Sequence, residues 1–228
     1  MNYKFDSNSK LVLFFIILTF ALVALYSGEI LSKNFLSTYT CLFFILTVGV
    51  SHGALDDIKG YKVLKFYKIK NKFVFYLSYI SFALLVILIW ILFPTTALTL
   101  FLIIAAYHFG KEDCWEMPTK KSNFNSIKFF LKGSLIILAP LWLSFDETVL
   151  IFNTLGVKNQ EFYNFLNYLN FNKLFLFLVF LSVLSNILIS RDLKYLTRIA
   201  WEIFCIFGLY YTFDPLVAFT IYFCFLHS

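Results

Sequence analysis

The stretch "YTCLFFILTVGV", residues 39–50, runs directly into "SHGALDD", residues 51–57. The first part is apolar enough to lie in lipid, whereas the second holds a histidine, a glycine and two adjacent aspartates. Ionisable side chains inside membrane segments are unfavourable, and they usually face a protein interior or a water-filled cavity. The junction therefore predicts a membrane helix that ends in a polar functional site.

The whole chain has the composition of an integral membrane protein. Of its 228 residues, 61% are hydrophobic and only 14% are charged, whereas a soluble domain has roughly 25% charged residues. Such a chain cannot cover a water-exposed surface with polar groups. We predict a single all-α integral membrane domain over residues 1–228, a polytopic bundle of about eight transmembrane helices.

Eight apolar runs give this number of helices. A complete span needs roughly 20 residues, and several of the runs are shorter. The first run lacks an A-x-A cleavage site, so it is predicted to be a retained span and not a signal peptide. The runs are residues 11–27, 38–55, 73–93, 96–110, 129–145, 174–190, 199–213 and 215–228.

Positive charge is unevenly distributed between the segments that connect these runs. If successive spans cross the membrane in opposite directions, fifteen lysines and arginines lie on one side of the membrane, six of them in the predicted loop 56–72. Only Lys33, Lys158 and Lys173 lie on the other side, and Lys132 lies just inside the fifth run. Basic residues gather in cytoplasmic loops, so both chain ends are expected on the cytoplasmic side of a multi-pass protein of the cell (inner) membrane.

Two further expectations follow from charge and periodicity. The net charge of +6 does not indicate nucleic acid binding, because no basic face with stacking aromatics is present in the sequence. The longest predicted non-cytoplasmic loop, 146–173, contains "EFYNFLNYLNF", in which apolar residues recur near helical spacing. This pattern predicts an interfacial helix.

The three histidines of the chain, His52, His108 and His227, all lie in apolar runs. Each falls near the predicted cytoplasmic end of its run, about 12 to 15 residues from the start, which is roughly 18–22 Å along a helix. A lone buried histidine commonly satisfies a backbone carbonyl, but three at one depth indicate a shared site. Imidazole is the commonest metal ligand near neutral pH, and without paired cysteines such a cluster suits iron, zinc or copper.

Acidic pairs follow two of the histidines, four and five residues on, in the pattern H-x-x-x-[DE]-D. A residue four positions along a helix lies on the same face, where a carboxylate could accept the second imidazole N–H and fix its tautomer. The candidate acids are Asp56, Asp57, Glu112 and Asp113. Alternatively, these acids only mark where a span meets water.

Two glycines, Gly53 and Gly110, lie beside the histidines. They either permit close helix packing or only end the spans.

At these residues the sequence resembles the Brp/Blh family of bacterial and archaeal membrane proteins, the β-carotene 15,15'-dioxygenases. The matching pieces are "SHGALDD" at 51–57, "YHFGKEDCWE" at 107–116 and the terminal "FCFLHS" at 223–228. The motif H-G-A-L-D is fairly specific, the second is moderately specific, and the third is too short to decide alone. The spacing of the motifs and the hydropathy agree along essentially the whole chain.

The resemblance implies an oxidoreductase that cleaves the central 15,15' double bond of β-carotene with O2, giving two molecules of all-trans-retinal for a microbial rhodopsin. It also implies a non-haem Fe(2+), for which His52, His108 and His227 become the ligands and, through the metal, the catalytic residues. The family carries a further histidine in an H-S-x-x-H pattern, whereas this sequence stops at Ser228. The last run therefore looks truncated within its helix, and the expected fourth ligand is absent from it.

Other classes of membrane protein remain as alternatives. The main one is a polytopic transporter or a proton- or ion-handling protein, whose intramembrane histidines relay protons or bind an ion. No inverted repeat is evident in the sequence to support it. A di-iron desaturase or hydroxylase needs several histidine boxes, and the chain has only three histidines. A structural membrane protein without chemistry is the remaining alternative.

Overall fold

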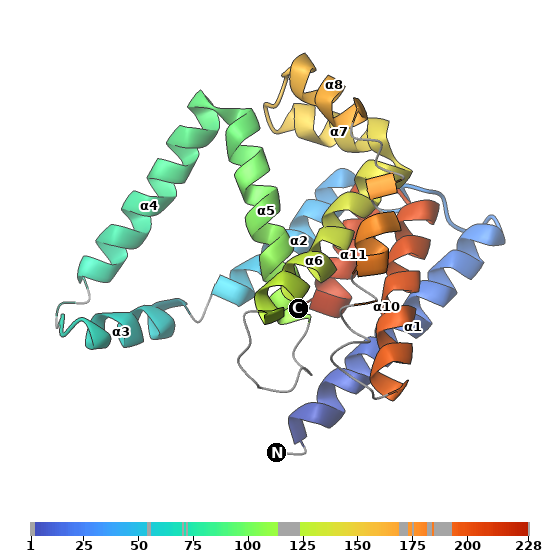
Figure 1. Ribbon diagram of the computed structural model, residues 1–228, viewed down its shortest axis with the longest axis horizontal. Helices are drawn as coiled ribbons and strands as arrows, with labels where there is room; N and C mark the ends of the chain where they lie inside the picture. The colour runs from blue at the N-terminus through green and yellow to red at the C-terminus, as the bar shows by residue number, and fades with distance from the viewer. Residues whose placement is uncertain are drawn as a thin grey trace.

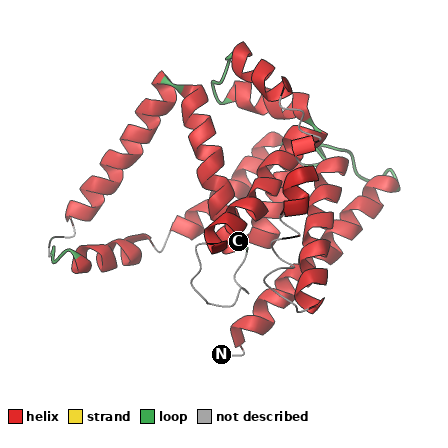
Figure 2. Cartoon of the chain, viewed as in Figure 1, coloured by secondary structure: helices red, strands yellow, loops and turns green. Residues whose placement is uncertain are grey.

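The computed structural model describes residues 3–53, 56–69, 71, 73–113, 124–168, 173–174, 176–181, 184 and 193–227. These residues form helices and their connections, with no strand among them (Figures 1 and 2). The predicted all-α fold class is confirmed. The helices are α1 (Tyr3–Ser27), α2 (Thr38–Gly53), α3 (Asp56–Phe66), α4 (Phe73–Leu92), α5 (Pro94–Glu112), α6 (Phe124–Leu143), α7 (Phe145–Thr154), α8 (Gln160–Tyr168), α10 (Leu193–Thr212), α11 (Pro215–Tyr222) and the π-helix η1 (Phe223–His227).

The predicted number of eight spans is not confirmed. Within the described residues, three helical segments are both long and apolar enough to cross a membrane, Lys10–Ser27, Phe73–Leu92 and Asn125–Leu143. Thr38–Gly49 and Pro215–His227 are apolar but shorter, and α5 has threonines in its first turns and charged residues in its last. Most of the predicted run 174–190 lies outside the described residues.

The hydrophobic core lies between α1, α2, α6, α10 and α11. α1 packs along α10, while α11 packs against both α2 and α10. Large side chains such as Phe15, Leu209, Tyr210 and Phe213 are almost fully buried there. Burying one side chain of this size contributes about 1.5–3 kcal/mol in water, so this part of the bundle forms a fixed frame for the C-terminal helix.

α4 lies outside this frame, and with α3 it projects away from the bundle (Figure 1). None of the residues of α4 is buried, although the helix is apolar on every side. A helix that is hydrophobic all round belongs in an apolar environment. The exposure of α4 therefore agrees with a membrane protein whose lipid-facing surface is bare in an isolated chain.

α5 and α6 cross with their backbones in contact. A Cβ atom added at Gly110 would lie 1.7 Å from the carbonyl oxygen of Phe129, and one added at Gly133 would lie 1.7 Å from that of Ala106. Neither position can hold a side chain without moving a helix, and small residues of this kind permit close helix packing. Of the two alternatives for Gly110, the structure supports close packing. The crossing fixes the C-terminal end of α5 on α6.

Two predicted connections contain helices. The segment 56–72 was expected to be a loop, which is wrong for its first part, because Asp56–Phe66 forms α3. Gly60 of α3 lies against the ring of Phe75 on α4, where an added Cβ would be 2.2 Å from the ring. The helix expected in 146–173 is present as α8. Its location at a membrane interface stays a prediction.

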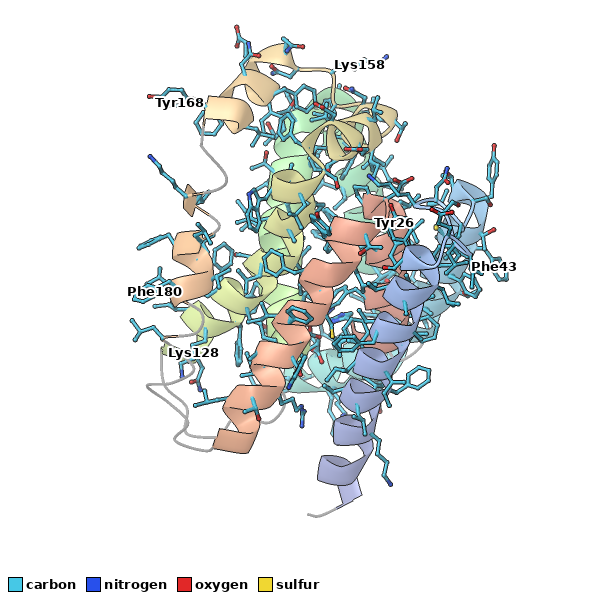
Figure 3. All side chains as sticks on the ribbon, turned by 90° about the vertical axis from the view of Figure 1, so that its right-hand side faces the viewer. Tyr26, Phe43, Lys128, Lys158, Tyr168 and Phe180 are labelled. Carbon is cyan, nitrogen blue, oxygen red and sulfur yellow. The ribbon has the colours of Figure 1, made fainter. Side chains whose placement is uncertain are left out.

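The flanks and ends of the molecule carry different side chains (Figure 3). Phe43 and Phe180 project outward from opposite flanks, whereas Lys158 lies at one end of the bundle. Lys158, in the connection between α7 and α8, is exposed there.

Candidate functional site

Two of the three histidines meet at the C-terminal end of α5. His108 lies one turn before the end of α5, and His227 is the last residue of η1. Their ring centroids are 5.4 Å apart, with the rings inclined by 72°. The side chain of His227 is buried, whereas that of His108 is exposed. The structure thus brings together two histidines from distant parts of the sequence.

The third histidine is described only by its backbone. His52 lies in the last turn of α2, and α2 packs against both α11 and η1. Its side chain, like those of Asp56 and Asp57, lies outside the described part of the structure. Among the described residues, no three His, Cys, Asp or Glu side chains are grouped closely enough to hold a metal ion.

Asp113, the C-cap residue of α5, binds the histidine of the other helix. The Nδ1 of His227 lies 3.0 Å from the Oδ1 of Asp113, and the hydroxyl of Tyr222 donates to Oδ2 at 2.6 Å. The Asp113 side chain is only 5% exposed, so water does not compete for these bonds. The i+4 acid of the predicted motif, Glu112, is exposed instead. Asp113 therefore ties the end of α5 to α11 and η1.

Aromatic rings enclose His227 on several sides. Phe109 forms a T-shaped pair with it at a centroid distance of 4.7 Å, and Phe223 is stacked at 5.7 Å. Tyr222, whose hydroxyl binds Asp113, is also stacked, at 6.1 Å. Packing of this kind leaves the imidazole little rotational freedom. The carboxylate and the rings together fix the orientation of His227.

These residues fit a metal site of the kind that histidines form. A ligating histidine usually donates its other ring N–H to a carboxylate or carbonyl, which sets its tautomer and raises its basicity. A carboxylate only accepts hydrogen bonds, so its contact with Nδ1 assigns the proton to that atom and leaves Nε2 of His227 as the nitrogen that could bind a metal ion. His108, on a separate helix, supplies a second imidazole at a distance from which both can approach one ion.

The family model of β-carotene 15,15'-dioxygenases matches residues 43–228, well over half of the chain. The chain belongs to the β-carotene 15,15'-dioxygenase family. A curated protein named β-carotene 15,15'-dioxygenase, from the uncultured marine bacterium 66A03, is 28% identical over 194 residues. The aligned region is 83% of this chain and 66% of that relative, so the chain spans just under two thirds of the relative's length. No solved structure matched the chain.

The region matched by the dioxygenase family contains the whole site described above, including α5, α11 and η1. Sequence reasoning identified the histidines and Asp113 but missed Tyr222. A tyrosine in an aromatic-rich run gives no distinctive signal, and its role depends on a contact with a residue 109 positions away. The only available hint is that Tyr222 lies five residues before His227 in the same apolar run.

We expect Tyr222→Phe to weaken the site of this dioxygenase-family protein without unfolding it. The substitution keeps the buried ring and removes one hydrogen bond to Asp113, and a hydrogen bond to a charged group contributes about 1.5–3 kcal/mol. Loss of such a supporting contact typically lowers metal affinity or activity about 10- to 100-fold. The affinity of the purified chain for added Fe(2+), measured by titration, would show the loss. An affinity equal to that of the parent chain would contradict the role of Tyr222.

Proposed function

We propose that this chain cleaves the central 15,15' double bond of β-carotene with O2, giving two molecules of all-trans-retinal. One observation carries the proposal, namely that the ring centroids of His108 and His227 lie 5.4 Å apart within the region matched by the dioxygenase family. The curated relative bears the name of this activity. Asp113, held by Tyr222, gives His227 the support that a metal-ligating histidine needs.

Non-haem Fe(2+) is the proposed cofactor, with His52, His108 and His227 as its ligands. When bound, iron supplies the activation of O2 that an unassisted polyene lacks. The three imidazoles would hold the ion as neutral ligands and would leave its positive charge uncompensated. In this proposal, Asp113 retains the Nδ1 proton of His227, and Tyr222 holds the carboxylate in place.

The surroundings of the histidines suit a hydrocarbon substrate. Phe109 and Phe223 exclude water beside His227, while β-carotene itself partitions into the bilayer. Direct entry of β-carotene from the lipid into the site would avoid a transfer through water, which is unfavourable for a long apolar molecule. The site would then lie towards the cytoplasmic half of the cell membrane, and retinal would pass to a rhodopsin through the lipid.

Expression in β-carotene-producing bacteria tests this function. Cells that make the chain are expected to lose their yellow colour and accumulate retinal, because one substrate molecule gives two aldehydes. Cells that make Lys158→Ala, an exposed position between α7 and α8, serve as a control and should bleach equally. Persistent colour and unchanged β-carotene, with the chain present in the membrane fraction, would contradict the proposal.

A further inference from the structure

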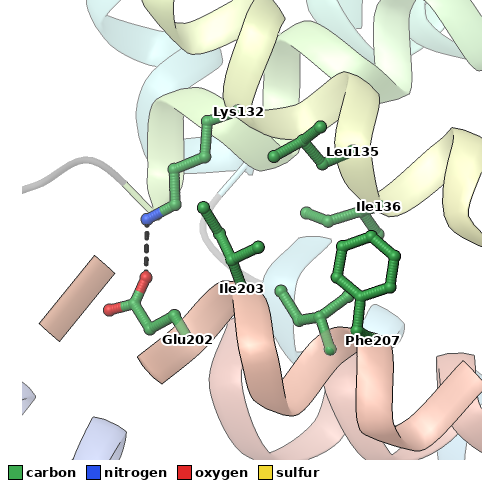
Figure 4. Close-up of a pocket in the computed structure, with 7 residues that line it drawn as sticks. Lys132, Leu135, Ile136, Glu202, Ile203 and Phe207 are labelled. Carbon is green, nitrogen blue, oxygen red and sulfur yellow. Dashed lines mark hydrogen bonds and ion pairs between the residues drawn. The ribbon is translucent and has the colours of Figure 1, made fainter. Parts of the chain in front are cut away.

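A buried ion pair between α6 and α10 lies next to the histidine site. The Nζ of Lys132 lies 2.8 Å from the Oε2 of Glu202, and the two side chains are only 6% and 5% exposed. Arg198, one turn before Glu202 on α10, approaches the other carboxylate oxygen at 3.5 Å. Figure 4 shows the pair at one edge of a small pocket whose remaining wall is apolar.

Lys132 also reaches the site itself. Its Nζ donates to the backbone carbonyl oxygen of Asp113 at 2.8 Å. The side chain of the same residue binds His227 and Tyr222. One ammonium group therefore contacts both Glu202 on α10 and the residue that orients His227. The close crossing at Gly133, the next residue in α6, brings Lys132 to this position.

We propose that Lys132 is a positioning residue, which holds Asp113 and through it fixes the imidazole of His227, while Glu202 holds the ammonium group in place. A buried ion pair alone is weak support for stability, since apolar residues of similar size often replace one without loss. The hydrogen bond to Asp113 gives Lys132 a task that an apolar residue cannot take over. This inference deepens the proposed function, because it names the residue that supports one proposed iron ligand.

Three variants distinguish a role of Lys132 in positioning Asp113 and His227 from a role in packing alone. Lys132→Met removes both contacts and leaves Glu202 buried beside Arg198. Lys132→Met combined with Glu202→Met removes the whole pair, so the fold is kept, but the hydrogen bond to Asp113 is lost. Glu202→Gln keeps an oxygen acceptor for Lys132 and leaves the contact with Asp113 intact.

The readout is the reaction of diethylpyrocarbonate with the metal-free, detergent-solubilised chain, followed by mass spectrometry. His227 is 6% exposed and should react slowly in the parent chain, whereas His108 is exposed and provides an internal reference in every sample. Because neither iron nor substrate is present, the result is independent of whether the chain cleaves β-carotene. Retinal formation by the parent chain is measured separately. A chain that does not cleave β-carotene is therefore recognised independently of the result for Lys132.

We expect the reaction of His227 to be about tenfold faster in Lys132→Met and in the double variant, the ratio at the lower end of the range for a lost hydrogen bond to a charged group. In Glu202→Gln it should stay within about twofold of the parent chain, because the bond to Asp113 remains. Parent-like protection of His227 in the double variant would overturn the inference. Equal acceleration in Glu202→Gln and Lys132→Met would also overturn it, because it would make the ion pair the decisive contact.

Discussion

Replacing His108 or His227 by alanine is expected to reduce retinal formation by more than about 100-fold, since loss of a residue that merely supports a ligand already lowers affinity or activity about 10- to 100-fold. Iron content should fall in parallel, because each variant removes a proposed nitrogen ligand. The two imidazoles lie on different helices, and their rings are 5.4 Å apart. Neither can therefore take over the position of the other without moving its helix.

The histidine variants need a control that changes the neighbourhood but not the ligands. Tyr107→Phe alters the exposed residue next to His108 and should leave both iron content and retinal formation close to those of the parent chain. All variants must be present in the membrane fraction at similar levels. Full activity of either alanine variant would remove that histidine from the ligand set.

The second large effect is expected at the crossing of α5 and α6. In Gly110→Ala the new methyl group would lie 1.7 Å from the carbonyl oxygen of Phe129, which belongs to the backbone and cannot rotate away. The helices must separate, and overpacking of this kind destabilises by about 1–3 kcal/mol or more. Because Asp113 follows three residues later, the separation would also withdraw the carboxylate from His227. We expect a lower melting temperature together with loss of iron.

Gly208 offers a matched control for this substitution. It also lies inside a helix, α10, but an added Cβ there would meet no atom within 4 Å. Gly208→Ala should therefore be neutral or stabilise by up to about 1 kcal/mol, the difference in helix propensity. Thermal unfolding of the two variants in the same detergent measures the contrast. Equal melting temperatures would show that α5 and α6 are not in backbone contact at Gly110.

The sequence predicts the helices well, because an apolar run that lies in lipid is expected to be helical. In lipid the backbone N–H and C=O groups must bond to each other, and a helix achieves this within one segment. The number of spans is harder to predict, since a short apolar helix such as α11 is buried by its neighbours, and its length alone does not show whether it crosses a membrane. The basic segment after His52 was expected to be a loop because it is polar, yet α3 forms there.

The structure brings two of the predicted histidines together, but it pairs the acid with a different histidine from the one that the motif assigns. The spacing H-x-x-x-[DE]-D assigns an acid to the histidine of its own helix, whereas Asp113 binds His227, which is 114 residues away. Only the approach of η1 to the end of α5 makes that contact. Lys132 and Glu202 could have been found from the sequence, because opposite charges in apolar runs are unfavourable unless they are paired.

The most direct test is the product ratio of the purified chain, loaded with Fe(2+) under anaerobic conditions and then supplied with β-carotene and O2. Cleavage at the central bond predicts two molecules of all-trans-retinal for each β-carotene consumed. No aldehyde longer than retinal should be formed. Chromatography with authentic standards measures both. Longer apocarotenals, or β-carotene that persists beside the iron-loaded chain, would contradict the assignment of this histidine site to central cleavage.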